Sequence, residues 1–201
     1  WVWEPSSRRL TVAVGDVAGK GLAAGLVMVM VRSLWRHLLE QGRALPALMR
    51  ELNRRLYQDT EPNIFVSFLV LQWDGAVGRL VSCGAGHENI MIYRAVGSRM
   101  EAVPSGGTVL GIRDLDDSAF PLQPISWETG DQIFLASDGL REAMSPSGEQ
   151  LESDRLLELL ARHCRRLRGD SLVRAALEEV NRFEAGRAAD DKTLVWLERS
   201  A

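Results

Sequence analysis

LTVAVGDVAGKGLAAGL, residues 10–26, combines a β-branched run, an acidic glycine-rich turn and the start of a long apolar helix. Thr11, Val12 and Val14 predict a strand, and Asp16 stands at its end. The three glycines of the turn let the backbone fold tightly around this carboxylate. A rigidly held carboxylate suits Mg²⁺ or Mn²⁺, because these hard cations prefer oxygen ligands at fixed geometry.

Two further acidic turns adjoin predicted strands. Asp138 follows an apolar strand in LASDGL, and Asp190 and Asp191 precede the last strand in ADDKTL. Taken alone, each turn has an ordinary structural explanation, such as a helix N-cap or a plain connection between elements. Adjacent carboxylates on extended backbone project in different directions, so only one of the final pair is expected to face a shared site. Together the three turns lead us to expect that Asp16, Asp138 and Asp190 converge on one metal centre.

The same glycine-rich turn invites comparison with a phosphate-binding loop, but the match fails. A Walker motif needs four residues between its glycines and a Ser or Thr after the lysine. Here three residues separate Gly15 from Gly19, and Gly21 follows Lys20. A nucleotide-binding loop is therefore disfavoured.

The overall composition is that of an ordinary soluble protein. The chain has 201 residues, 46% of them hydrophobic and 25% charged, enough for one domain spanning residues 1–201 with a substantial core. A formal charge of −3 and a pI near 5.7 argue against a nucleic-acid partner. The chain opens with Trp1, which favours a domain excised from a longer protein.

Cysteine usage and hydropathy bear on the compartment. Cys83 and Cys164 fit no metal-binding or redox spacing, and we expect two buried thiols in a reducing, cytoplasmic environment. The longest apolar run, residues 22–31, is too short to cross a bilayer, and no secretory signal is present. Direct membrane insertion is not expected.

The order of predicted elements indicates the fold class. A strand end is expected at residues 1–5, with the polar turn SSRR joining it to a strand at 10–14 in a hairpin. Further strands are expected at residues 64–73, 79–83, 89–93, 125–127, 132–136 and 192–197, and Asp74-Gly75 signals a hairpin between the first two of these. Helices are expected at residues 22–41, 46–57, 153–166 and 171–184. Ser153 and Ser171 are the expected N-caps of the last two helices. Because strands and helices do not alternate, the pattern predicts an α+β fold, an antiparallel β-sandwich flanked by helix pairs.

Six segments in this order resemble a known family: GDVAGKG, FVSFLVL, AGHENIMIY, GTVLGI, GDQIFLASDGLREAM and DDKTLVWL. The set, which covers essentially the whole chain, is similar to the SpoIIE/RsbU-type branch of the metal-dependent (PPM-type) protein serine/threonine phosphatases. The resemblance implies a bacterial enzyme of signal transduction, with a helix-flanked β-sandwich. It implies hydrolysis of phosphoserine or phosphothreonine on a small regulatory protein, notably an anti-anti-sigma factor, as in sigma factor regulation.

The resemblance also implies roles for particular residues. Asp16 should bridge two Mn²⁺ or Mg²⁺ ions, joined by the backbone carbonyl of Val17, while Asp138 and Asp190 should each bind an ion. Two such ions about 3.5–4 Å apart lower the pKa of a bridging water and clamp the phosphoryl oxygens during attack. Asp191 is then expected to contact the metal ligands without binding the metal itself, or to face a partner protein.

Several other motif positions receive a lesser role. Gly139 and Thr193 match positions expected to be structural. For His87 we favour an orienting hydrogen bond within its turn over metal ligation. Lys20 matches the pattern without acquiring a chemical role.

One departure from the family pattern opens an alternative. Family members carry a Gly-Gly-Asp motif shortly before the GDV strand, whereas WVWEPSSRRL holds no Asp or Gly and only Glu4 is acidic. Either the family's N-terminal strand lies before Trp1, together with an upstream sensory or regulatory domain, or the domain is degenerate. In the second case the chain is a catalytically impaired regulatory or binding domain of the same fold.

Overall fold

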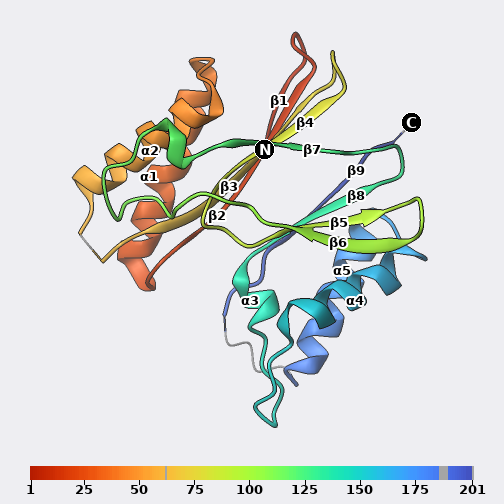
Figure 1. Cartoon of the computed structure of the whole chain (residues 1–201). Helices are drawn as coiled ribbons and strands as arrows, with labels where there is room; N and C mark the ends of the chain where they lie inside the picture. The colour runs from red at the N-terminus through yellow and green to blue at the C-terminus, as the bar shows by residue number, and fades with distance from the viewer. Residues whose placement is uncertain (62, 186–189, 201) are drawn as a thin grey trace. The chain divides into compact units, whose positions relative to one another are not determined.

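The computed structural model describes residues 1–61, 63–185 and 190–200 (Figure 1). The strands are β1 (Val2–Glu4), β2 (Arg9–Val17), β3 (Val66–Asp74), β4 (Arg79–Ala85), β5 (Ile90–Arg94), β6 (Arg99–Val103), β7 (Leu122–Ile125), β8 (Gln132–Ala136) and β9 (Leu194–Glu198). The helices are α1 (Gly21–Glu40), α2 (Leu45–Asp59), the 3₁₀ turn η1 (Asp117–Ala119), α3 (Asp138–Arg141), α4 (Glu152–Cys164) and α5 (Gly169–Phe183).

The elements divide into two compact units. The first unit, residues 1–87 and 105–126, holds a five-stranded sheet in the order β1-β2-β3-β4-β7, with α1, α2 and η1. The second, residues 88–104 and 127–201, holds a four-stranded sheet in the order β6-β5-β8-β9, with α3, α4 and α5. Every strand pairing is antiparallel. The predicted α+β class, with antiparallel sheets and helix pairs, is confirmed, while a single domain over 1–201 stays a prediction.

In the first unit, α1 and α2 bury one face of the sheet. Alternate residues of β3, among them Phe68 and Val70, join the helices' apolar side chains in one cluster. The ring of Trp35 on α1 meets Phe68 edge to face, with ring centres 6.5 Å apart. The register of β2 on β3 places Asp16 directly opposite Ser67 at one end of the sheet.

The buried face of α1 differs from the expected one. The apolar repeat of this helix runs through Leu22, Leu26, Val29, Met30, Leu34 and Leu38. Of these only Leu38 is buried, and Leu22, Leu26 and Val29 are 80%, 61% and 62% exposed. Because residues 22–31 are apolar on nearly every side, their periodicity does not single out a face. The C-terminal half of α1 sets the orientation instead, through Trp35 and the residues around it.

Length and composition alone would let α1 cross a membrane, with a mean hydropathy of 1.4 in its most apolar window. This is weak evidence, because core helices of soluble proteins pass the same criterion. Five buried side chains of α1 belong to the helix–sheet core of the first unit.

In the second unit, α4 and α5 cover one face of the sheet (Figure 1). Phe134 of β8 is fully buried among apolar side chains of both helices, including Leu160 and Val180. Cys164 lies in this cluster, and Cys83 lies in the core of the first unit. Both cysteines are free and buried, as the sequence predicts.

Three local predictions are wrong. The strand expected at residues 125–127 lies earlier, as β7, and pairs with β4. Ser153 and Ser171 are not N-caps, because α4 and α5 begin at Glu152 and Gly169, both with positive φ. Each helix therefore begins at a residue with a left-handed backbone conformation. The presence of a serine near the start of a helix does not reveal this conformation. Strand β6, which pairs with β5, is not among the predicted strands.

The predicted hairpin at the N-terminus is confirmed, because β1 pairs antiparallel with β2.

Candidate metal centre

Asp16 stands near the C-terminal end of β2, with its side chain exposed. The glycine before it is required by packing: a Cβ on Gly15 would lie 2.4 Å from Cδ2 of Phe68. Gly19 and Gly21 have φ of +110° and +78°, so the turn into α1 needs residues without a side chain. The acidic glycine-rich turn predicted from the sequence is thus a tight strand-to-helix connection that leaves the carboxylate at the surface.

A second arrangement forms where β8 ends and β9 begins. The backbone N–H of Ser137 donates to the carbonyl of Thr193 at 3.1 Å, and the Thr193 N–H donates to Ser137 Oγ at 3.0 Å. The same hydroxyl donates to the carbonyl of Asp191 at 3.2 Å. Ser137 therefore fastens the turn that carries Asp138 to the segment that carries Asp190.

Gly139 allows these two segments to touch. A Cβ at this position would lie 2.3 Å from the carbonyl oxygen of Asp191 and 3.5 Å from the Cβ of Asp190. The first distance is far below van der Waals contact, so any side chain here would force the segments apart. The structural role predicted for Gly139 follows directly from this approach.

The carboxylates suit a hard cation. Asp138 is the first residue of α3, half-buried, and has no side-chain hydrogen bond or ion pair with the described residues. Asp190 is exposed, and its Oδ1 accepts the N–H of Asp191 at 2.9 Å. A half-buried carboxylate without a counter-charge is costly unless a cation compensates it, and carboxylate oxygens are the ligands that Mg²⁺ and Mn²⁺ prefer. The residues present therefore fit the divalent ions that the resemblance implies.

The structure brings together the segments that carry two of the three predicted carboxylates. Asp138 and Asp190 lie on adjoining segments of the second unit, whereas Asp16 and Val17 belong to the first unit. Over residues 1–61, 63–185 and 190–200, no group of three or more His, Cys, Asp or Glu side chains forms a ready metal site. The convergence of Asp16 with the other two stays a prediction.

His87 makes a side-chain hydrogen bond to strand β3, and the bond expected within its own turn stays a prediction. Its ring is nearly buried, and Nδ1 lies 2.9 Å from Oγ of Ser67, the residue opposite Asp16 in the sheet. The hydroxyl of Ser105 donates to the carbonyl of His87. Sequence reasoning missed both serines, although a lone serine in the apolar strand FVSFLVL was a usable signal. The contacts favour an orienting role for His87 beside Asp16.

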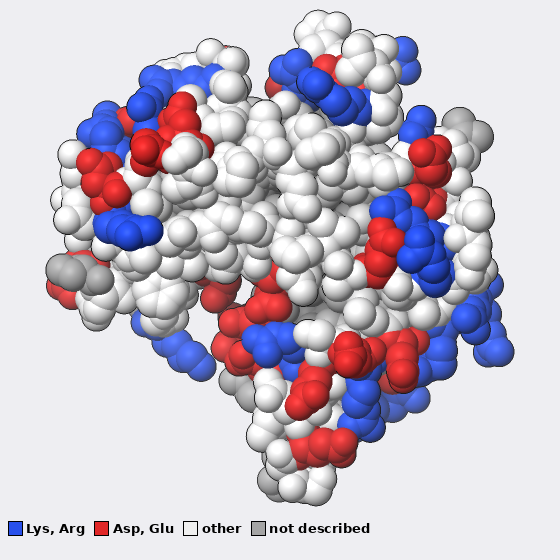
Figure 2. Space-filling model, in the orientation of Figure 1, with Lys and Arg blue, Asp and Glu red and all other residues white. Residues whose placement is uncertain are grey.

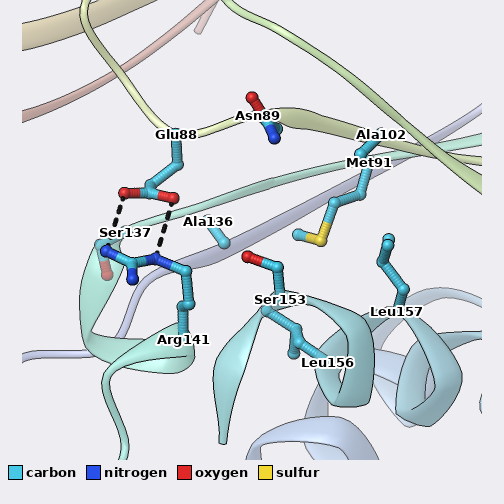
Figure 3. A pocket seen from close by; sticks show the side chains of 10 residues that line it. All are labelled: Glu88, Asn89, Met91, Ala102, Ala136, Ser137, Arg141, Ser153, Leu156 and Leu157. Atoms are coloured by element: carbon cyan, nitrogen blue, oxygen red, sulfur yellow. Dashed lines mark hydrogen bonds and ion pairs between the residues drawn. The ribbon is translucent and has the colours of Figure 1, made fainter.

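A small hollow lies next to Ser137 in the second unit (Figure 3). Arg141 of α3 forms an ion pair with Glu88, with Nε 3.3 Å from the carboxylate, on one side of the hollow. Burial opposes the charge of Arg141, but Glu88 and Glu142 together outweigh burial and raise the pKa of the guanidinium. The free volume of about 30 Å³ is large enough for one water molecule and too small for a substrate. The ion pair joins α3 to the segment before β5.

Charges are mixed on the face shown in Figure 2, where acidic and basic side chains alternate without a broad basic area. This agrees with the formal charge of −3. It gives no support to a nucleic-acid surface.

Comparison with known proteins identifies the family. The family model for stage II sporulation protein E (SpoIIE) matches residues 6–200. The chain belongs to the SpoIIE family. This confirms the resemblance seen in the ordered motifs.

One relative of this SpoIIE-family chain is a phosphatase by name, and a second match is a solved structure. It is 28% identical over 192 residues to the phosphoserine phosphatase RsbU of Bacillus subtilis (strain 168), covering 94% of the chain and 56% of RsbU. A structure of RsbU and RsbW domains from Mycobacterium tuberculosis superposes with a TM-score of 0.81 at 25% identity, covering 96% of this chain and 52% of that one. The chain thus spans about half the length of these relatives.

The fold is also shared with a more distant solved structure. The catalytic domain of the serine/threonine protein phosphatase PstP, in complex with two manganese ions, matches with a TM-score of 0.67. Identity is 16%, and the match covers 95% of this chain and 88% of PstP. At this identity the likeness shows the fold alone.

Proposed function

We propose that this SpoIIE-family chain is the catalytic domain of a metal-dependent protein serine/threonine phosphatase. The observation that carries the proposal is the contact of the Asp138 turn with the Asp190 segment, which only a glycine at position 139 permits. The family membership and the name of the relative RsbU support the same reaction class.

The proposed ligands are the carboxylates of Asp16, Asp138 and Asp190 and the carbonyl of Val17. The bound form of PstP supports manganese as one suitable ion, and magnesium has the same ligand preferences. When bound, such ions supply an activated water and neutralise the charge of the phosphoryl group. The protein's part is to hold the carboxylates in place: Ser137 fastens the Asp138 turn, and Ser67 with His87 supports the strand end at Asp16.

The chain's cysteines do not support the alternative chemistry of a cysteine-dependent phosphatase. Burial raises the pKa of Cys83 to about 12, and burial likewise raises the pKa of Cys164 to about 12. A thiol is a nucleophile only as its thiolate, which is nearly absent at neutral pH for such groups. A metal-activated water is the route that the available residues favour.

For the substrate, we propose a small regulatory phosphoprotein of the anti-anti-sigma-factor type, acted on in the cytoplasm. The named relatives support this choice, since one of their structures joins an RsbU domain to an RsbW domain. We also propose a neighbouring sensory or regulatory domain in the parent protein, because the chain covers 56% of RsbU.

Substitution of the carboxylates tests the proposal. In the full-length protein, Asp16→Asn and Asp138→Asn should each lower Mn²⁺-dependent hydrolysis of a phosphoserine protein and of p-nitrophenyl phosphate by about 100-fold or more. Thermal unfolding should stay close to that of the unaltered protein, because Asp16 is exposed and Asp138 only half-buried. Full turnover in both variants would refute the assignment.

The second candidate function is a binding domain without catalysis, the alternative that the sequence motifs leave open. Such a domain would bind the phosphoprotein but leave its phosphate in place. Measuring both binding and phosphate release from the unaltered full-length protein separates the two functions, since the enzyme must release phosphate with Mn²⁺ present.

A further inference from the structure

A buried ion pair lies beside the Asp190 segment in the second unit. The ammonium of Lys192 is 2.7 Å from Oε2 of Glu184, and the two side chains are 8% and 1% exposed. The Arg94–Asp131 pair of the same unit is less buried, with side chains 15% and 3% exposed. Lys192 stands two positions after Asp190, and Glu184 directly follows helix α5.

The location of Glu184 makes its partner important. A carboxylate at the C-terminal end of a helix is disfavoured by the helix dipole, and burial adds a desolvation cost. Neither carboxylate oxygen of Glu184 accepts a well-oriented hydrogen bond from the described residues. The Lys192 ammonium is therefore the group that compensates this charge, and moving Lys192 away would leave a buried anion unpaired.

The pair completes the anchoring of the segment between Asp190 and Thr193. Ser137 holds the carbonyl of Asp191 and the N–H of Thr193 from the side of β8. Lys192, between them in sequence, is held by Glu184 from the side of α5. Anchors from two elements thus fix the backbone next to Asp190.

We infer that Lys192 and Glu184 are positioning residues for Asp190. The part of this inference that concerns metal rests on the proposed function. Groups that orient a ligand without touching the metal typically contribute 10–100-fold to metal affinity. The pair would act in that way, by holding the backbone from which the Asp190 carboxylate extends.

The test uses Lys192→Met and the milder Glu184→Gln in the full-length protein, with Lys192→Glu/Glu184→Lys as a rescue of the pair. Arg168→Met is the matched control, because Arg168 forms a 3.0 Å ion pair with Glu198 in the same unit but is 49% exposed. Amide hydrogen exchange of residues 191–193 is measured without metal, and Mn²⁺ affinity is measured by calorimetry. The Mn²⁺ affinity of Asp190→Asn is measured in the same way, to show whether Asp190 binds the ion.

Both single variants should speed exchange at residues 191–193 by about tenfold or more and weaken Mn²⁺ binding about 10–100-fold. The double variant Lys192→Glu/Glu184→Lys should recover much of the slow amide exchange and much of the Mn²⁺ affinity. Arg168→Met should change neither the exchange rate nor the Mn²⁺ affinity. Unaltered exchange in Lys192→Met and Glu184→Gln would overturn the anchoring role. Faster exchange with unaltered Mn²⁺ affinity would overturn the positioning role, provided that Asp190→Asn does bind more weakly.

If Asp190→Asn binds Mn²⁺ like the unaltered protein, the proposed metal assignment fails instead. The positioning inference fails with it, while the exchange data still decide whether the pair anchors the segment.

Discussion

At the scale of single residues, Gly139 shows how a backbone contact can demand one amino acid. Its φ is not in the left-handed region, so conformational freedom does not explain the glycine. The reason is space, because the carbonyl of Asp191 occupies the position of a side chain. The motif in the sequence predicts a structural role for Gly139. The structure adds the reason, which is the close approach of the Asp191 carbonyl.

Gly139→Ala should therefore destabilise the protein by roughly 1–3 kcal/mol, the usual cost of overpacking. Thermal unfolding measures the loss, and Mn²⁺ titration should show weaker binding because the Asp138 turn is displaced. Gly25→Ala is the control: nothing lies within 4 Å of its added Cβ, and alanine favours the helix. A Gly139→Ala protein as stable as the unaltered chain would show that the contact is not tight.

Asn53 supports a second residue-scale prediction. The side chain is fully buried on α2, where Nδ2 donates to the carbonyl of Arg113 and Oδ1 accepts the N–H of Gly111, each at 2.9 Å. Asn53→Leu leaves the buried N–H of Gly111 and the partly buried carbonyl of Arg113 without this partner. The free energy of unfolding should fall by about 2–4 kcal/mol, as measured by urea denaturation. A loss below about 0.5 kcal/mol would contradict this.

At the scale of elements, strands β3, β4, β5 and β8 could be predicted because alternation and turn residues are local signals. The hairpin at Asp74 and Gly75 is an example. The orientation of α1 could not be predicted, because residues 22–31 are apolar on nearly every side. The face that is buried depends on what the helix packs against. Strand β7 was misplaced because its partner, β4, lies far away in sequence.

Helix α2 carries a pH-dependent element of stability. Hydrogen bonds from Arg54, with a further one from Arg55, lower the pKa of Glu51 from 4.5 to about 2. Because the folded pKa is below the ordinary value, the stabilisation is complete above pH 4.5 and is lost as the pH falls towards 2.

Glu51→Gln should therefore lower the melting temperature at pH 6 and change it less at pH 3. Glu40→Gln is the control, since Glu40 is exposed and forms no ion pair with the described residues. An equal effect of Glu51→Gln at both pH values would show that the arginine contacts contribute no pH dependence.

At the scale of the whole molecule, the sequence supplied the candidate ligands but not the groups that support them. Asp138 and Asp190 were predicted from ordered motifs, and their segments do meet. Ser67 and the Lys192–Glu184 pair were missed, because their partners are 20 and 8 positions away along the chain and follow no helical or strand period. Such contacts arise from packing, which no local pattern encodes.

Removing divalent metal tests the dependence of activity on the ions. A chelator should abolish phosphatase activity, and added Mn²⁺ should restore it, because the proposed reaction relies on the ions to activate water. Unfolding temperature should rise when Mn²⁺ is returned, since an ion that binds only the folded state stabilises it. Activity that survives complete chelation would rule out the proposed chemistry.

The central proposal is that Asp16 and Asp138 bind the same divalent centre. Calorimetric Mn²⁺ titration of the full-length protein, Asp16→Asn, Asp138→Asn and the double variant tests it most directly. The account predicts that each single substitution weakens the tightest site by about tenfold or more, and that the double variant loses much less than the sum of the two free energies because both act on one site. Unchanged Mn²⁺ binding in either single variant, or fully additive losses from two independent sites, would contradict the account.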